Sequence, residues 1–327
     1  MPVLEIRDLE ISFYNGKKQT RRTDRVSFDV QPGEIVALVG ESGCGKSITA
    51  LSVLGLLPRQ GRVTGGEILF EGRNLLALSE KELDAVRGRE ISMIFQDIMY
   101  SLNPVLTIGS QLTEGMRRHL GYTKQQAREK AVRLLARTGV RDAEAVMKKY
   151  PHMLSGGMRQ RVMIAMALSC EPKILIADEP TTALDVTIQL QIMQLLKSLR
   201  DEFGMSILLI THDIGVVAEM ADRVVVMYAG QCVEAADTRA LLRSPRHPYT
   251  QALLSAVPGV TDDKKRRLYS IPGAVPENYP ELTGCRFAER CPHAAKCPAQ
   301  GEWREAEDGR LVRCEMAAAE GRKAYGA

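Results

Sequence analysis

The sequence predicts an α/β fold with a parallel β-sheet, and three patterns support this prediction. First, Ile35–Val39 is a continuous apolar, β-branched-rich segment of the kind that is buried on both faces of a parallel sheet. Second, strand and helix patterns alternate after residue 170, as expected for βαβ units. Third, a glycine-rich loop, Gly40–Ser47, lies between Ile35–Val39 and the apolar segment Ala50–Leu57, which we expect to be a buried helix ended by Pro58.

Short apolar segments and helical patterns give the expected order of elements. The expected strands are Leu4–Ile6, Ser27–Val30, Ile35–Val39, Glu67–Phe70, Ile91–Phe95, Ile174–Ala177, Ile207–Ile210 and Val224–Tyr228. Between them, Thr123 and Gln126 can form a capping box, and apolar residues at helical spacing follow. We therefore expect a helical subdomain over about residues 97–165. A change in composition near Leu242 predicts one domain over residues 1–242 and an extension over residues 243–327.

Composition excludes several classes of function. The 327 residues carry 44 basic and 40 acidic side chains, and a net charge of +4 is too small to indicate a nucleic-acid partner. No apolar run approaches the roughly 18 residues that span a bilayer. The first residues, Met1–Glu5, lack the basic-then-apolar pattern of a signal peptide. These features predict a cytoplasmic protein that could still dock on a membrane partner.

The glycine-rich loop predicts a phosphate-binding site. Its residues, Gly40, Glu41, Ser42, Gly43, Cys44, Gly45, Lys46 and Ser47, form the pattern Gly-x4-Gly-Lys-Ser between a strand and a helix. The glycines allow successive backbone N–H groups to converge on phosphate oxygens at the helix N-terminus. Lys46 would reach the β- and γ-phosphates, and the Ser47 hydroxyl would bind Mg²⁺.

Two adjacent carboxylates follow the expected strand Ile174–Ala177. Asp178 and Glu179 would lie at the carboxyl end of that strand, the edge where ligands bind in open α/β sheets. We expect Asp178 to hold Mg²⁺ and Glu179 to act as the general base on the attacking water.

A second anion site is predicted at Ser155, Gly156 and Gly157, because they precede a helix. With Leu154 and Met158 they match four of the five positions of the Leu-Ser-Gly-Gly-Gln signature, Met158 being the departure. Over about residues 1–240 the sequence resembles an ATP-binding cassette (ABC) ATPase. The resemblance implies a RecA-like nucleotide-binding domain with an inserted helical subdomain, here followed by a small cysteine-containing extension.

The resemblance implies roles for further residues. Gln96 matches the glutamine that contacts the metal and the attacking water, and His212 matches the histidine that contacts the γ-phosphate. Asp185, after Ala183 and Leu184, matches the D-loop at the interface between two cassettes. Phe13 or Tyr14 would stack on adenine, with Phe13 slightly favoured. Two cassettes would pair head to tail, so that the Gly40–Ser47 loop of one and Ser155–Gly157 of the other enclose each ATP.

A narrower resemblance is to the ATPases of oligopeptide, dipeptide and nickel importers. It depends on Tyr150–His152, on the form of the signature at Ser155–Leu168, and on Arg246–Thr250 with Leu253 and Leu254. This implies a second ATPase, either a paralogue or a copy, two permease subunits, an extracytoplasmic binding protein and a location on the cytoplasmic face of the membrane. The alternatives are a soluble ATP-switched regulatory protein and a redox-sensing ATPase. Peptides, nickel chelates and opines all remain candidate solutes.

Four cysteines, Cys285, Cys291, Cys297 and Cys314, cluster in the extension. A reducing cytoplasm disfavours disulfides, and the spacing differs from the pairs that structural zinc prefers. Cys-Pro sequences occur in iron–sulfur sites, and related importer ATPases with this tail carry a [4Fe-4S] cluster, so we favour a cluster over zinc or unligated thiols. Nearby cations would balance its charge: Arg286, Arg290, Lys296 and Arg313. His293 is an alternative ligand.

Overall fold

The computed structural model describes residues 1–97, 101–182, 185–256, 270–276, 279–297, 304–305 and 310–314. The chain forms two compact units, each assembled from separate parts of the sequence. The first unit comprises Met1–Leu4, Val30–Ile35 and Leu69–Ile210, and the second comprises Glu5–Asp29, Val36–Ile68 and Thr211–Ala327. The domain boundary near Leu242 stays a prediction.

Three parallel strands form the centre of the first unit: β6 (Ile91–Ile94), β7 (Ile174–Asp178) and β8 (Ser206–Ile210). Every residue of β7 and β8 is buried, in agreement with the apolar runs in the sequence. The other elements are β5 (Arg73–Asn74), η1 (Leu75–Ala77), α2 (Glu80–Val86), α4 (Ile108–His119), α5 (Lys124–Arg137), α6 (Ala143–Val146), η2 (Pro151–Met153), α7 (Gly156–Ala167) and α8 (Val186–Phe203).

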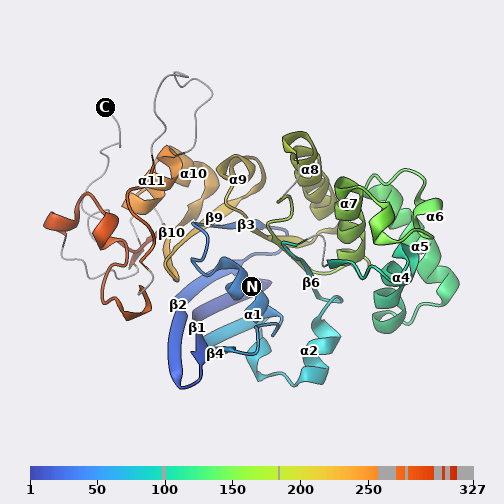
Figure 1. Cartoon of the computed structure of the whole chain (residues 1–327), viewed down its shortest axis with the longest axis horizontal. Helices are drawn as coiled ribbons and strands as arrows, with labels where there is room; N and C mark the ends of the chain where they lie inside the picture. The colour runs from blue at the N-terminus through green and yellow to red at the C-terminus, as the bar shows by residue number, and fades with distance from the viewer. Residues whose placement is uncertain are drawn as a thin grey trace. The chain divides into compact units, whose positions relative to one another are not determined.

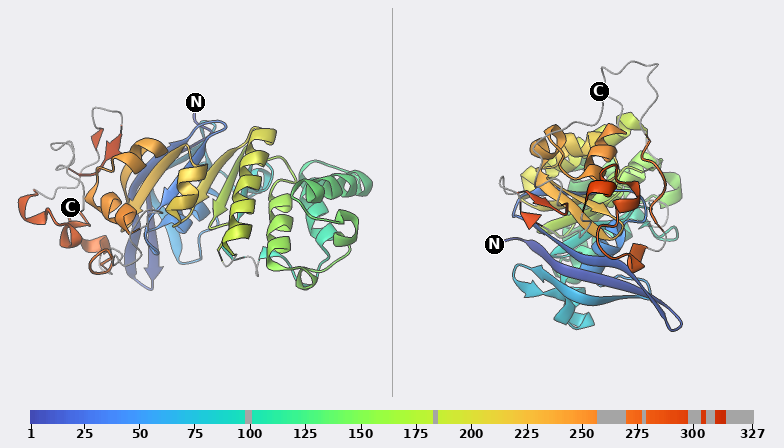
Figure 2. Two further views of the ribbon diagram at one scale, coloured as in Figure 1. Left: turned by 90° about the horizontal axis from the view of Figure 1, so that it is seen from above. Right: turned by 90° about the vertical axis from the view of Figure 1, so that its left-hand side faces the viewer.

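The helices α4, α5, α6 and α7 pack on one another, as Figures 1 and 2 show. The capping box predicted for α5 is confirmed: the Thr123 hydroxyl accepts from Gln126 N, and the Gln126 side chain accepts from Thr123 N. The predicted apolar face of α5 is buried, because Ala127, Ala131 and Leu134 lie in the core.

Two sets of strands form the second unit. In one, β1 (Leu4–Asn15) lies between β2 (Lys18–Val30) and β4 (Gly61–Phe70), and in the other the order is β11-β12-β10-β9-β3. The strands of the second set are β3 (Ile35–Val39), β9 (Arg223–Tyr228), β10 (Gln231–Asp237), β11 (Arg304–Glu305) and β12 (Leu311–Val312). The helices of this unit are α1 (Lys46–Val53), α9 (Ile214–Met220), α10 (Thr238–Arg243), α11 (Pro248–Ser255), η3 (Tyr279–Glu281), η4 (Ala288–Arg290) and η5 (Ala294–Lys296). Strand β3 is parallel to β9, and β10 is antiparallel to both β9 and β12.

Two expectations about this unit are wrong in their boundaries. Strands β1 and β2 are much longer than the apolar segments Leu4–Ile6 and Ser27–Val30, because exposed polar residues alternate with buried ones along them. Helix α1 ends at Val53 rather than at Pro58, and Gly55 follows with a left-handed φ of +62°.

The start of the extension shares a hydrophobic core with the strands. Tyr249, Tyr279 and Phe287 pack in one cluster with Val39 and Tyr228. The rings of Tyr249 and Phe287 lie 4.6 and 5.2 Å from that of Tyr228, and their centroids are 5.5 Å apart. Such aromatic contacts fix Phe287 relative to the end of β9.

Candidate nucleotide-binding site

The phosphate loop requires glycine at defined positions. Gly40, Gly43 and Gly45 have φ values of +149°, +79° and +106°, which L side chains rarely adopt. A Cβ at Gly40 would lie 2.1 Å from the Met227 carbonyl oxygen. Gly45 is the N-cap of α1, so the loop leads directly into the helix N-terminus as predicted.

The Lys46 ammonium group lies against this loop. Its Nζ donates to the carbonyl oxygens of Gly40, at 2.8 Å, and Glu41, at 3.1 Å, and lies 3.7 Å from Cys44 Sγ. Lys46 is only 6% exposed, whereas Ser42 and Gly43 are exposed and Ser47 is half-buried. Burial raises the pKa of the Cys44 thiol, so it remains a neutral packing group. The loop therefore presents a buried cation beside accessible backbone.

The first unit contains the two carboxylates. Strand β7 ends at Asp178, which is 4% exposed, and Glu179 follows with a left-handed φ of +45°. The Glu179 Oε2 atom accepts hydrogen bonds from Gln96 Nε2, at 2.8 Å, and from Thr182 Oγ1, at 2.9 Å. The structure thus places the Gln96 amide against the Glu179 carboxylate.

The signature segment begins α7. Ser155 is its N-cap and its Oγ accepts from Met158 N at 3.4 Å, while Ser155 and Gly156 are exposed. Gln160 on the same helix donates to the Pro180 carbonyl, directly after Glu179. Asp185 caps α8 by accepting from Ile188 N at 3.0 Å. Ala183 and Leu184 of the expected D-loop lie outside the described residues.

The remaining predicted residues lie in the second unit with the phosphate loop. His212 is exposed just before α9. Phe13 is half-buried and Tyr14 is 37% exposed, both in β1, and a Cβ at Gly61 would lie 3.3 Å from the Phe13 ring. The choice of the adenine-stacking ring stays open.

Sequence reasoning missed Thr182, Gln160, Tyr249 and Arg290 as neighbours of these groups. Thr182 could have been found, because it follows the Asp178–Glu179 pair within one turn. Arg290 could not, since its partner Glu41 is 249 residues away in the sequence.

The four tail cysteines line one small pocket, together with His247, Phe287 and His293. The pKa of Cys285 is raised to about 11, mainly by burial and also by the charges of the other three thiols. Among the residues that the structure describes, no three His, Cys, Asp or Glu side chains are arranged around a single metal ion.

Arg286 and Arg290, expected from the sequence to help balance a cluster's charge, each pair with a carboxylate in the structure, and their role toward a cluster stays a prediction. Arg286 pairs with Asp24, Nη2 to Oδ2 at 2.8 Å, and Arg290 pairs with Glu41. Arg313 Nε donates to the Cys232 carbonyl oxygen. These cations are held by carboxylates and carbonyls that lie far away in the sequence.

Comparison with known proteins identifies the family. The family described as ABC transporter matches residues 23–182, and the chain is 52% identical to the oligopeptide transport ATP-binding protein AppD of Bacillus subtilis, over 98% of each chain. The chain belongs to the ABC transporter family. It is an ABC ATPase with an ABC nucleotide-binding fold. Residues 233–297 match the oligopeptide/dipeptide transporter C-terminal region.

Two further relatives of the ABC ATPase are informative. It is 48% identical to the dipeptide transport ATP-binding protein DppD of Escherichia coli, over 96% of each chain. A dimeric ATP-binding cassette, MJ0796, solved in a post-hydrolysis state bound to ADP and Pi, matches with a TM-score of 0.65 at 28% identity, over 72% of this chain and 99% of that one. No helix within the described ranges is both long and apolar enough to cross a membrane.

Proposed function

We propose that this ABC ATPase hydrolyses ATP to drive the import of peptides, or of related small solutes such as metal chelates, through membrane permeases. The observation that carries the proposal is the pairing of a cassette with the oligopeptide/dipeptide transporter C-terminal region at residues 233–297. The names of the relatives at 52% and 48% identity agree with peptides as the solute class. The chain would work on the cytoplasmic face of the membrane as a peripheral subunit.

In the proposed ATP hydrolysis, different residues bind the phosphates, hold Mg²⁺ and activate the attacking water. Backbone N–H groups of Gly40–Ser47 and the Lys46 ammonium group would bind the phosphates, because a buried cation beside a helix N-terminus attracts them. Ser47, Gln96 and Asp178 would hold Mg²⁺, which neutralises phosphate charge. Glu179 would take the proton of the attacking water, and His212 would contact the γ-phosphate.

Each nucleotide would be completed by a second cassette, either a paralogue or a copy. Ser155 and Gly156 are exposed at the N-terminus of α7, where a second chain can reach them. Asp185 would lie at the same interface. The likeness to a dimeric ATP-binding cassette supports this arrangement.

A groove in the first unit offers a place for a permease. Its volume is about 310 Å³, and its lining includes Phe95, Gln111, Glu114 and Met166. Phe95 is 41% exposed and directly precedes Gln96. A short permease helix in this groove would contact Phe95, which is next to Gln96, the donor to Glu179. Docking of the permease would thereby be linked to ATP hydrolysis. An extracytoplasmic binding protein would deliver the solute to the permeases.

The four tail cysteines would hold a [4Fe-4S] cluster rather than one zinc ion. Their spacing differs from the pairs two to four residues apart that structural zinc prefers. Four thiols that line one pocket could each bind a different iron of a cluster. Iron and sulfide analysis of anaerobically purified protein should give four of each per chain. Zinc, or neither metal, would contradict this part of the proposal.

One experiment separates the proposal from its alternatives. Purification from native membranes should recover the chain with integral membrane subunits, and the complex should hydrolyse ATP. A chain that never co-purifies with membrane subunits would support a soluble ATP-switched regulatory protein. ATP turnover that changes with reduction of the cysteines in the absence of permeases would support a redox-sensing ATPase.

A further inference from the structure

The segment between Cys285 and Cys291 is joined to the phosphate loop by a charged pair. Arg290 Nη1 lies 2.8 Å from Glu41 Oε2, and Arg290 Nη2 lies 3.0 Å from Glu41 Oε1. This two-bond geometry is the strongest form of an arginine–carboxylate contact. Glu41 is the second residue of the Gly40–Ser47 loop. The pair therefore connects the extension to the loop directly.

Arg290 is placed for this contact by buried aromatic rings. Its guanidinium group lies 5.6 Å from the Tyr228 ring centroid and 5.9 Å from that of Phe287, and Nη1 donates to Tyr228 Oη at 3.2 Å. The Arg290 side chain is 6% exposed and that of Glu41 is 25% exposed. The hydrogen bonds to Glu41 raise the pKa of Arg290 above its usual value. Poor access to water strengthens the attraction between the two charges, and loss of either partner would leave the other as an unpaired buried charge.

Glu41 is held by its backbone as well. Its N–H group donates to Tyr249 Oη at 2.9 Å, and its carbonyl oxygen accepts from Lys46 Nζ at 3.1 Å. Tyr249 lies in α11, at the start of the extension. Two residues of the extension thus fix the residue whose carbonyl helps to orient the phosphate-binding lysine.

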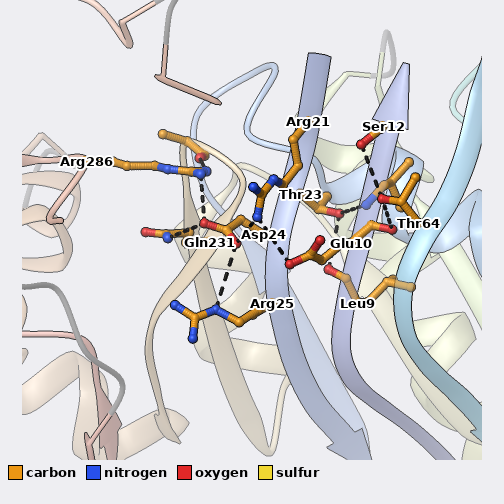
Figure 3. A network of polar contacts seen from close by, with 12 residues as sticks. Leu9, Glu10, Ser12, Arg21, Thr23, Asp24, Arg25, Thr64, Gln231 and Arg286 are labelled. Carbon is orange, nitrogen blue, oxygen red and sulfur yellow. Dashed lines mark hydrogen bonds and ion pairs between the residues drawn. The ribbon is translucent and has the colours of Figure 1, made fainter. Parts of the chain in front are cut away.

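A different contact anchors the extension without touching the loop. Arg286 pairs with Asp24 at 2.8 Å and donates to the Ala229 carbonyl oxygen at 2.5 Å, and Gln231 Nε2 also donates to Asp24 (Figure 3). The Arg286 network already attaches the segment between Cys285 and Cys291 to β2. The Arg290–Glu41 pair is therefore not needed for attachment and must have another effect, on the phosphate loop.

We propose that Arg290 and Tyr249 are positioning residues of the phosphate loop, through which the extension sets the affinity of the cassette for ATP. By holding Glu41 they keep its carbonyl oxygen beside Lys46 and the loop amides in place. This inference rests on the proposed use of Gly40–Ser47 to bind phosphate. It is independent of what the cysteine pocket holds.

The test compares variants of the full chain for binding of a fluorescent ATP analogue and for the KM and kcat of ATP hydrolysis. Arg290→Gln should raise both Kd and KM about tenfold with a smaller change in kcat, since the lost pair couples two contacting groups. Arg290→Lys should recover part of the affinity, and Tyr249→Phe should weaken binding about threefold. Arg223→Gln removes a half-buried pair with Asp29 elsewhere in the same unit, and should leave Kd unchanged.

A double-mutant cycle identifies the contact itself. Glu41→Gln and Arg290→Gln combined should bind ATP no more weakly than Arg290→Gln alone. The inference is overturned if Arg290→Gln binds within twofold of the wild type, or if it loses no more affinity than Arg223→Gln. A wild-type chain that binds nucleotide no better than Lys46→Ala would instead refute the proposed use of the loop.

Discussion

Gln96 Nε2 donates a hydrogen bond of 2.8 Å to Glu179 Oε2, which joins the end of β6 to the end of β7. Thr182 donates to the same oxygen, and Glu179 itself has a left-handed backbone conformation. A non-glycine residue with positive φ persists only where its surroundings determine it. The carboxylate proposed as general base is therefore positioned by side chains on both sides of it in the sequence.

Replacing that carboxylate tests its role in the chemistry. Glu179→Gln should lower kcat by a factor of about 10² to 10⁴, because general-base catalysis is lost. The Gln side chain retains an oxygen that can accept from Gln96, so Kd for ATP should stay near the wild-type value. Single-turnover hydrolysis and equilibrium binding measure the two quantities. Unchanged turnover would show that another group takes the proton.

Thr182 offers a milder test of the same site. Thr182→Val removes the hydroxyl that donates to Glu179 at nearly constant volume, and should lower kcat several-fold with little change in KM. Thr182→Ser keeps the hydroxyl and should retain most of the activity. Steady-state kinetics of both variants would contradict the positioning role if Val and Ser gave the same kcat.

Gly40 should be irreplaceable for a steric reason. Gly40→Ala would place a Cβ 2.1 Å from the Met227 carbonyl oxygen in addition to straining a φ of +149°, so the free energy of unfolding should fall by more than about 3 kcal/mol. Gly33→Ala is the matched control: φ there is +74° with nothing within 4 Å of the added Cβ, and the cost should be about 1 kcal/mol. Denaturant unfolding measures both free energies, and equal costs would contradict the close approach of Gly40 to the Met227 carbonyl oxygen.

Asp24 should contribute stability that depends on pH (Figure 3). Burial alone would raise its pKa, but the Arg286 charge and the Gln231 hydrogen bond outweigh burial and lower it. A carboxyl whose pKa is lowered in the folded state contributes its full stability to the fold above its unfolded pKa of about 3.9. That contribution is lost as the pH falls through the lower pKa of the folded state.

Asp24→Asn should accordingly lower the free energy of unfolding at pH 7 by about 3 to 5 kcal/mol, because Arg286 is left as a buried charge. The loss should begin to shrink below about pH 3.9, where the unfolded carboxyl takes up a proton, and should disappear only as the pH falls through the lower folded pKa. Unfolding curves at pH 7 and at about pH 2 measure the difference. The same deficit at both values would contradict the assignment.

The local parts of this structure follow from the sequence for physical reasons. Strand β3 coincides with the apolar run Ile35–Val39, and the Thr123–Gln126 capping box begins α5, because both depend on neighbouring residues alone. The ends of β1 and β2 were missed because a half-exposed strand contains as many polar as apolar residues. Gly55 ends α1 before Pro58 by adopting a left-handed conformation that the apolar pattern does not reveal.

Long-range contacts could not be predicted in the same way. The sequence suggested that Arg290 would lie near a metal cluster, and nothing local pointed to Glu41 as its partner. The convergence of Cys285, Cys291, Cys297 and Cys314 on one pocket was expected from their clustering in the tail. The strand pattern pointed to Glu179 and the resemblance pointed to Gln96, whereas their mutual hydrogen bond and the hydroxyl of Thr182 are visible only in the structure.

ATP-driven uptake by the intact complex tests the central claim most directly. Proteoliposomes would contain this chain with its native permeases and binding protein, with ATP on the side of the ATPase. The account predicts that a labelled peptide accumulates in proportion to ATP hydrolysed, and that Glu179→Gln abolishes both hydrolysis and accumulation. Accumulation that continues with Glu179→Gln, or hydrolysis with no uptake of peptide or metal chelate, would contradict it.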